Sequence, residues 1–207
     1  MNVIGAPMRD YYERRAREYD DWWLGTGLFA RRERPGWHEE VQRLIALLEE
    51  LRPARTLDVA CGTGFLTRHL PGEVTGLDQS ATMVEIATAR GLDAVEGEAV
   101  PLPFAEGAFE RVFTSHFYGH LVPGEEAERF LAEARRVAGE LVVVDSAIRP
   151  DIEDERWEER RLNDGSAHEV YKRRFRASAL ARELGGEVLH DGDWFVAVRA
   201  GRAPTRP

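Results

Sequence analysis

The residues that decide the fold are 57–67, which read Leu57-Asp58-Val59-Ala60-Cys61-Gly62-Thr63-Gly64-Phe65-Leu66-Thr67. This run predicts a β-strand that ends in a glycine turn and opens a helix. Gly62 and Gly64 carry no Cβ, so the backbone there can approach a ligand closely. Because doubly wound sheets bind cofactors at the carboxyl ends of their strands, the turn predicts a cofactor site.

The spacing of the turn narrows the kind of cofactor. A fingerprint for nicotinamide or flavin dinucleotides would read Gly-x-Gly-x-x-Gly, whereas Thr67 occupies the third glycine position. The turn therefore fits a cofactor without a pyrophosphate better than a dinucleotide. Glycine turns after strands are also common in purely structural settings, so the interpretation depends on the surrounding motifs.

Beyond the turn, short β-rich runs alternate with helical stretches. This alternation predicts an α/β fold, a three-layer sandwich on a doubly wound, mostly parallel seven-stranded sheet with an antiparallel C-terminal strand. The run Leu141-Val142-Val143-Val144 is apolar on both faces, as a central strand covered from both sides should be. The expected strands and helices are 56–60, 64–70, 74–77, 81–90, 94–96, 111–114, 125–137, 141–144, 178–184, 187–190 and 194–199.

The segments flanking this core have their own patterns. Residues 8–23 are charged and aromatic without Gly or Pro, which predicts a helix that serves as a lid, joined to the core by a flexible connector. Apolar residues at helical spacing predict a second helix from Trp37 to Leu51. Residues 150–164 are rich in Glu and Arg and are expected to form a helical insertion, and the tail 201–207 is expected to be disordered.

A chain of 207 residues can bury one sizeable core and is short for two. We therefore expect a single domain. Its parts are the lid and connector (1–36), the cofactor-binding core (37–146), a variable insertion on the acceptor side (147–177), and a C-terminal helix and strand pair (178–200).

Composition excludes several classes of function. The chain is 43% hydrophobic and 31% charged, with no apolar run long enough to span a membrane and no signal-peptide layout at its N-terminus, which favours a cytoplasmic, soluble protein with no membrane partner. The net charge of -9 disfavours nucleic acid as a partner. A lone cysteine, Cys61, excludes a disulfide framework. The expected partner is a small-molecule acceptor, and the chain is expected to be a monomer or homodimer.

Three further motifs follow the glycine turn in order. Residues 74–80 read Val-Thr-Gly-Leu-Asp-Gln-Ser, residues 97–104 read Gly-Glu-Ala-Val-Pro-Leu-Pro-Phe, and residues 105–112 read Ala-Glu-Gly-Ala-Phe-Glu-Arg-Val. Together with the turn, they resemble the class I (Rossmann-like) S-adenosylmethionine-dependent methyltransferases, particularly the small-molecule branch that includes the ubiquinone/menaquinone biosynthesis type. The resemblance covers residues 51–145 well and the flanks only in general layout.

The resemblance implies S-adenosylmethionine as cofactor, S-adenosylhomocysteine as its product, and a role for each matching residue. In the family, the acid and the glycine turn hold the methionine part of the cofactor, the acid after the second strand binds the ribose hydroxyls, and the later acid-Ala pair reads the adenine. Carried over to this chain, the implied cofactor-binding residues are Tyr19, Asp58, Ala60, Cys61, Gly62, Gly64, Asp78, Gln79, Met83, Glu98, Ala99 and Ser115.

The chain departs from the family pattern at three places. Ala60 stands where a glycine often begins the turn, and Glu98 stands where aspartate is more usual and is one methylene longer. The loop before the strand at 141–144, often Pro-Gly-Gly, is reduced to Ala138-Gly139. Within the turn, Cys61 is expected to be a small buried filler and not a reactive thiol.

Residues 115–120, Ser-His-Phe-Tyr-Gly-His, follow the fourth strand, where the family places residues that face the acceptor. If the acceptor must lose a proton, His116 or Tyr118 is the candidate base. The alternative is that His116 only packs beside the cofactor and that His120 caps or packs the next loop. Their His-x-x-x-His spacing lacks a third ligand, so no metal site is expected.

Two flanking segments leave alternatives open. Tyr12 and Tyr19 lie seven residues apart, on one face of the expected lid helix. One alternative is that either tyrosine contacts the cofactor, and the other is that both only pack on the domain. The arginines of the insertion, such as Arg160, Arg161 and Arg174, either bind an anionic acceptor or belong to a solvated helix surface. Equally abundant acidic neighbours favour the solvated surface.

Three functions are consistent with the chain. The first is S-adenosylmethionine-dependent methyl transfer to a small-molecule acceptor by in-line displacement. The second is S-adenosylmethionine binding without transferase activity, in a regulatory or interaction module. The third, a nucleic-acid or protein methyltransferase, is disfavoured by the charge and by Ser115-His116-Phe117-Tyr118, where DNA amino-methyltransferases usually carry Asn/Asp-Pro-Pro-Tyr/Phe.

Overall fold

A computed structural model describes residues 6–201 of the chain and contains a seven-stranded sheet. The strand order is β3 (Asp93–Glu96), β2 (Gly72–Asp78), β1 (Ala54–Val59), β4 (Arg111–Ser115), β5 (Glu140–Ser146), β9 (Phe195–Gly201) and β8 (Gly186–Asp191). The pairs from β3 to β5 are parallel, whereas β9 is antiparallel to both β5 and β8. This confirms the predicted doubly wound sheet with an antiparallel C-terminal strand.

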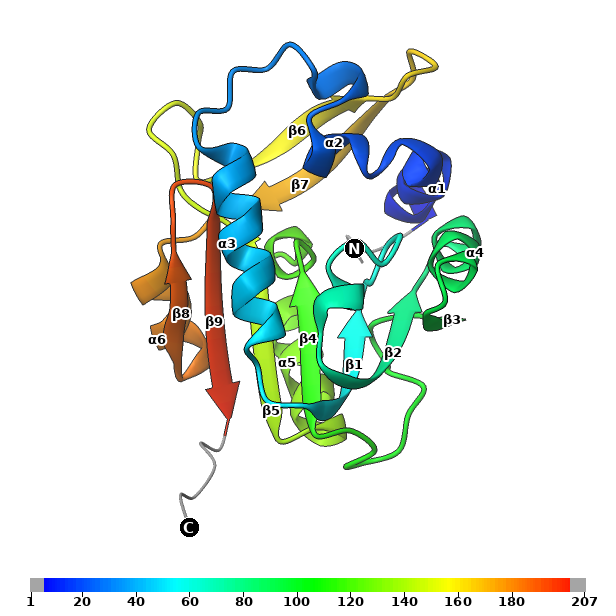
Figure 1. Cartoon of the computed structure of the whole chain (residues 1–207), viewed down its shortest axis with the longest axis vertical. Helices are drawn as coiled ribbons and strands as arrows, with labels where there is room; N and C mark the ends of the chain where they lie inside the picture. The colour runs from blue at the N-terminus through cyan, green and yellow to red at the C-terminus, as the bar shows by residue number, and fades with distance from the viewer. Residues whose placement is uncertain (1–5, 202–207) are drawn as a thin grey trace.

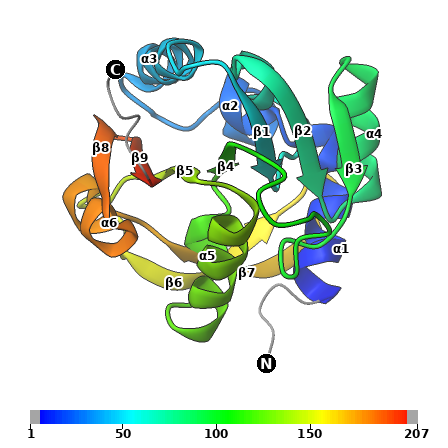
Figure 2. The ribbon, with the colours of Figure 1, turned by 90° about the horizontal axis from the view of Figure 1, so that it is seen from below.

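The central strands are buried on both faces because helices cover both sides of the sheet. Figure 2 shows α3 (Trp37–Glu49) on one side and α5 (Glu125–Val137) and α6 (Ala177–Leu184) on the other. The strand β5 is buried along almost its whole length, as its Leu-Val-Val-Val run predicted. These layers form the predicted three-layer sandwich.

The sheet places a binding edge at the top of Figure 1. The chain runs outward from β1 through β2 to β3 on one side and continues with β4 and β5 on the other. Ligands bind at such a reversal point, outside the carboxyl ends of the strands. The helix α4 (Ala81–Ala89) begins at this edge, where the Ser80 hydroxyl caps it by accepting a hydrogen bond from the Met83 N–H at 3.1 Å.

The N-terminal lid lies above this edge, but it is not one continuous helix. It consists of α1 (Ala6–Arg15), the 3-10 turn η1 (Ala16–Glu18) and α2 (Asp21–Leu24), followed by η2 (Gly27–Phe29). Gly25 ends α2 in a left-handed conformation with φ +71°. The predicted helix over 8–23 is therefore correct in its helical character and wrong in its continuity. Below, "the lid" denotes residues 6–24.

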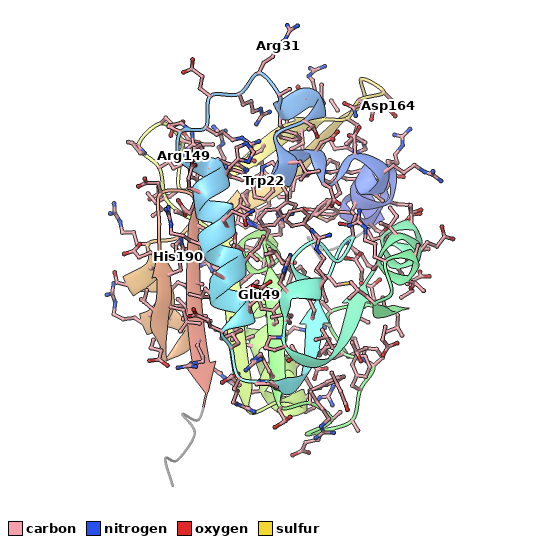
Figure 3. All side chains as sticks on the ribbon, viewed as in Figure 1. Trp22, Arg31, Glu49, Arg149, Asp164 and His190 are labelled. Carbon is pink, nitrogen blue, oxygen red and sulfur yellow. The ribbon has the colours of Figure 1, made fainter. Side chains whose placement is uncertain are left out.

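The insertion is a β-hairpin, so the helix predicted for 150–164 is wrong. The strands β6 (Glu155–Arg161) and β7 (Ala167–Arg173) pair antiparallel, and Asp164 marks the tip of the hairpin in Figure 3. Exposure alternates along β6: the side chains of Glu158 and Arg160 are 12% and 22% exposed, whereas those of Glu159 and Arg161 are 57% and 64% exposed. This is the two-residue period of a strand with one covered face.

Several shorter elements complete the fold. The predicted helix over 64–70 is reduced to a loop with the 3-10 turn η3 (Thr67–His69), and η4 (Tyr118–His120) follows β4. Among the described residues, no helix is long and apolar enough to cross a membrane. Apart from Gly201, which belongs to β9, the tail expected to be disordered lies outside the described residues.

Candidate functional site

The carboxyl ends of β1, β2 and β4 form one wall of a narrow cleft, and the lid covers it. Of the residues expected to bind a cofactor, nine line this cleft, and the candidate base His116 lines it as well. The nine are Tyr19, Ala60, Gly62, Asp78, Gln79, Met83, Glu98, Ala99 and Ser115. The sheet thus brings together residues that are up to 96 positions apart, the distance from Tyr19 to Ser115.

The glycine turn is held open by the carboxylate that follows β2. Ala60 adopts φ +61°, Gly62 φ +56° and Gly64 φ +77°, so three residues of the turn lie in the left-handed region. The Gly62 N–H donates to Asp78 Oδ2 at 2.9 Å, and the Ser80 N–H donates to Asp78 Oδ1 at 2.9 Å. Asp78 therefore fixes both the turn and the start of α4, while each of its oxygens keeps a second lone pair for a ligand.

Asp58 lies behind the turn and not on the wall of the cleft. Its Oδ2 accepts a hydrogen bond from the Thr67 hydroxyl at 2.6 Å, and its buried Oδ1 has no partner among the described residues. Burial raises the pKa of Asp58 to about 8 and that of Asp78 to about 6. The site thus holds two carboxyl groups that become easier to ionise when a cationic or hydroxyl-bearing ligand reaches them.

Four residues depart from their expected positions. Cys61 and Gly64 do not line the cleft: the Cys61 thiol faces the β2 backbone at Gly76, and a Cβ on Gly64 would lie 2.1 Å from the Leu92 Cδ1 atom. Both residues therefore allow the turn to pack on its neighbours. Asp58 supports the turn from behind, as described above.

The fourth departure is Tyr118, which the structure removes as a candidate base. Tyr118 is fully buried, and its hydroxyl donates to Glu183 Oε1 of α6 at 2.6 Å. Burial raises the pKa of Tyr118, so even less of the phenolate form is available to act as a base at neutral pH than in an ordinary tyrosine. Its side chain packs in the core against Phe130 and Phe175.

His116 lines the cleft directly after the end of β4. Its Nδ1 lies 3.8 Å from Asp145 Oδ1, and its buried Nε2 has no partner among the described residues. Its backbone is strained, with φ +58°. Burial, and after it the charges of Lys172 and Arg160, lower the pKa of His116 to about 3. The imidazole is therefore neutral and can accept or donate one hydrogen bond through Nε2, but it is a weak base.

Sequence reasoning did not assign a partner to the lid tyrosines, and the structure supplies one. The His120 Nδ1 lies 2.6 Å from the Tyr171 carbonyl, which can only accept, so this nitrogen carries the proton. The His120 Nε2 is then an acceptor for the Tyr12 hydroxyl at 2.8 Å. This bond joins the lid to η4 across 108 positions of sequence, and no local pattern predicts such a pairing.

Tyr19 and two acidic residues fix the rest of the lid. The Tyr19 ring lies over the glycine turn, 3.4 Å from where a Cβ on Gly62 would be. Asp20 accepts from the Thr63 hydroxyl at 2.5 Å, and Glu13 accepts from the Ser80 hydroxyl at the start of α4 at 2.5 Å. The lid therefore contacts both the turn and α4 and shields the cleft from water.

The cofactor implied by the resemblance fits the residues present. Four buried polar atoms of this region have no partner among the described residues: Asp58 Oδ1, Gln79 Oε1, Ser115 Oγ and His116 Nε2. Unsatisfied buried polar atoms are costly, and they cluster here around a cleft lined by Met83 and the Tyr19 ring. S-adenosylmethionine carries an amino group, two ribose hydroxyls and an adenine ring, which match this set of acceptors and apolar surfaces.

The raised pKa of Asp58 predicts an unusual pH dependence of stability. The pKa of an unfolded aspartate is ~3.9, so the folded protein binds more protons above that pH, and stability is lost as the pH rises toward about 8. Between about pH 5 and 7, this one group lowers the free energy of unfolding by about 1.4 kcal/mol per pH unit. Asp58→Asn is expected to lack this slope, as measured by urea unfolding of the ligand-free protein at a series of pH values.

The control for this prediction is Asp93→Asn, because Asp93 is exposed at the start of β3 and does not line the cleft. Its stability profile should run parallel to that of the wild type. Equal pH slopes for the wild type and Asp58→Asn would show that Asp58 is ionised in the folded, ligand-free protein over this range.

Comparison with known proteins agrees with the site. Residues 57–140 match the family model described as methyltransferase domain. The chain is 39% identical over 136 residues to phthiotriol/phenolphthiotriol dimycocerosates methyltransferase 1 of Mycobacterium ulcerans, covering 58% of this chain and 47% of that protein. It is 34% identical over 114 residues to demethylmenaquinone methyltransferase of Thermotoga maritima, covering 50% and 48%. The chain thus spans about half the length of these curated relatives.

A solved structure extends the likeness to the whole chain. The structure described as the DhpI-SAH complex superimposes with a TM-score of 0.70 and 25% identity, and the match covers 98% of this chain and 98% of that one. The likeness therefore includes the lid and the hairpin as well as the sheet. The strand order, the glycine turn and these matches support the resemblance to the class I, Rossmann-like S-adenosylmethionine-dependent methyltransferases.

Proposed function

We propose that the chain transfers the methyl group of S-adenosylmethionine to a small-molecule acceptor. The observation that carries the proposal is the position of His116, which lines the cofactor cleft and also a second, larger cavity under the hairpin β6–β7. The two cavities share Tyr12, Tyr19, His116 and His120. A cofactor cleft that opens into a separate cavity is the arrangement that a two-substrate transfer requires, whereas a binding module needs only the first.

The chain's own residues would supply binding, alignment and exclusion of water. When bound, S-adenosylmethionine supplies a methyl group on a positively charged sulfur, which an acceptor attacks in line. Asp78 and the turn at Gly62 would hold the cofactor on one side, and the lid, fastened through Tyr12 and Tyr19, would close the other. Such alignment can supply much of the rate of a displacement with a good leaving group.

His116 would orient the acceptor at the junction of the two cavities. Its low pKa keeps the ring neutral at ordinary pH, so protonation of His116 should not reduce the rate between about pH 6 and 8. We expect its free Nε2 to form a hydrogen bond with the acceptor, which makes it a contact of the reacting group and not a strong base.

The variant His116→Asn tests this role, because asparagine tolerates the left-handed backbone that His116 adopts. The turnover number should fall by at least about tenfold, the value of one well-placed hydrogen bond, while S-adenosylhomocysteine affinity changes by less than about threefold. The exposed His38→Asn serves as the matched control. Unchanged turnover in His116→Asn would remove His116 from the acceptor contact.

The function itself is tested by incubating the protein with S-adenosylmethionine and a panel of small acceptors while S-adenosylhomocysteine release is measured. Release that depends on an acceptor, and that Asp78→Ala abolishes, supports methyl transfer. Tight cofactor binding without turnover on any acceptor class would favour the alternative of a binding module.

A further inference from the structure

The second cavity lies between the sheet and the hairpin and has a volume of about 980 Å³. Most of its wall comes from four segments that are distant in sequence: the lid, the connector after it, the loop after β5, and the hairpin β6–β7. His116 and His120 after β4, and Trp194 before β9, complete it. Figure 3 labels Trp22 and Arg149, two of its lining residues, in the layer between the sheet and the hairpin. Because it meets the cofactor cleft at His116, it is the cavity in which an acceptor would lie.

The charge of this cavity is opposite to that of the chain. The chain carries a net charge of -9. The cavity, however, has an excess of positively charged side chains. Its basic lining residues are Arg15, Arg32, Arg34, Arg149, Arg156, Arg160, Arg161, Lys172 and Arg174, and its acidic lining residues are Glu18, Glu33, Asp151, Glu158 and Glu159.

One carboxylate in the cavity wall forms ion pairs with three guanidinium groups. Glu158 on β6 lies 3.5 Å from Arg156 Nε and 3.1 Å from Arg160 Nη2, and it also pairs with Arg174. A single negative charge can neutralise only one of these three cations. The hairpin face that covers the cavity therefore keeps an excess of positive charge, even where every arginine has a hydrogen-bond partner.

Arg15 provides a second, independent source of positive charge. Its side chain is buried, its Nη1 donates to the Tyr11 hydroxyl at 2.6 Å, and its guanidinium lies 5.0 Å from the centre of the Tyr19 ring. Within residues 6–201, Arg15 forms no ion pair with a carboxylate. A buried cation without a counter-charge is costly to maintain, so a fold that keeps one at a cavity wall is suited to receive an anion there.

Aromatic side chains complete the wall and indicate the rest of the ligand. Trp22, Trp37, Trp157 and Trp194 all line the cavity, and the Arg34 guanidinium lies 4.0 Å from the centre of the Trp37 ring. Flat apolar surfaces beside guanidinium groups are suited to an organic body that carries a charged end. Arginine can also bind a carboxylate or a phosphate group through two parallel hydrogen bonds.

We propose that this cavity binds the acceptor as a small organic oxyanion, a carboxylate or a phosphate-type group, held by Arg15 and Arg160 beside His116. The inference rests on the proposed function, because it names the class of acceptor for the same site. The sequence alone favoured a solvated surface for the hairpin arginines; the structure instead directs Glu158 and Arg160 into the wall.

Tryptophan fluorescence tests the proposal, because four of the five tryptophans of the chain line the cavity. The full chain is titrated at constant ionic strength with phenyl phosphate, benzoate and the uncharged benzyl alcohol, with and without S-adenosylhomocysteine. Saturable quenching by one or both anions, but not by benzyl alcohol, is expected. Preference for phenyl phosphate assigns a phosphate-type group, and preference for benzoate assigns a carboxylate.

Charge-removing variants locate the anion. Arg160→Gln and Arg15→Gln should each weaken the preferred anion by about tenfold or more, the effect of a lost charge-assisted hydrogen bond. Arg182→Gln, on the exposed face of α6 and outside both cavities, is the matched control and should bind normally. If either buried variant fails to fold, Arg32→Gln removes a cavity cation from an exposed position and should weaken binding about threefold.

The outcomes separate this proposal from the function on which it rests. Equal quenching by benzyl alcohol and the anions, no saturable quenching by either anion, or an equal loss in Arg182→Gln would overturn the oxyanion site. If S-adenosylhomocysteine still binds in those cases, the proposed methyl transfer stands. Loss of S-adenosylhomocysteine binding with anion binding intact would instead overturn the proposed function.

Discussion

Replacing Asp78 by alanine is expected to weaken binding of S-adenosylhomocysteine by at least about 100-fold, or ~3 kcal/mol. The loss has two physical sources. The carboxylate would accept hydrogen bonds from the ribose hydroxyls, and in the ligand-free protein it already accepts the N–H groups of Gly62 and Ser80. Alanine therefore removes a ligand contact and also releases the glycine turn that shapes the cleft.

Calorimetric titration of Asp78→Ala with S-adenosylhomocysteine measures this effect, after circular dichroism has shown that the variant is folded. Asp93→Ala is the matched control, because Asp93 is exposed at the start of β3 outside the cleft, where it accepts the Thr75 hydroxyl at 3.0 Å. Affinity within about threefold of the wild type in Asp78→Ala would exclude Asp78 from the cofactor site.

The second large effect is expected from Asp145→Ala, which should lower the free energy of unfolding by about 3–5 kcal/mol. Asp145 is fully buried at the end of β5, accepts the Gly119 N–H at 2.7 Å, and forms an ion pair with Lys172 of β7. Its removal leaves the Lys172 ammonium buried without a counter-charge. Because this pair joins the hairpin to the sheet, acceptor turnover should also be lost.

A double-mutant cycle separates the pair from other effects of the substitution. Adding Lys172→Met to Asp145→Ala removes the buried ammonium that has lost its counter-charge. The double variant should therefore be more stable than Asp145→Ala alone. Urea unfolding of the wild type, both single variants and the double variant gives the coupling energy. Additive effects of the two substitutions would show that the ion pair does not hold the hairpin on the sheet.

The elements of the fold that were predictable from sequence have strong local patterns. The helix α5 was expected at 125–137 and occupies Glu125–Val137, because its apolar residues repeat at helical spacing between acidic and basic ends. The sheet was predictable because each parallel strand is a short apolar run bounded by turns. The lid was only partly predictable, since its break at residues 16–20 follows from packing on the turn and α4.

The hairpin shows where local propensity fails. Residues 155–161 are almost all Glu and Arg, which favour a helix in isolation, yet they form β6 because alternate side chains are covered. The signal that could have found the hairpin is Asn163-Asp164-Gly165, a three-residue hairpin loop that ends in glycine. Gly165 adopts φ +85°, as such a turn requires.

The site was predictable where the resemblance has motifs and not elsewhere. Asp78, Gln79 and Met83 line the cleft as the resemblance implied. The Tyr12–His120 bond and the basic cavity were not predictable, because their residues come from segments that meet only in the folded chain. Tyr118 was a reasonable candidate base from its position after β4, but the side chain points to α6.

The central claim is that the cleft beneath the lid binds S-adenosylmethionine, and calorimetric titration of the full chain with S-adenosylmethionine and S-adenosylhomocysteine tests it most directly. The site predicts one molecule bound per chain with a micromolar or lower dissociation constant for each. Absence of binding to both compounds by a properly folded protein would contradict it.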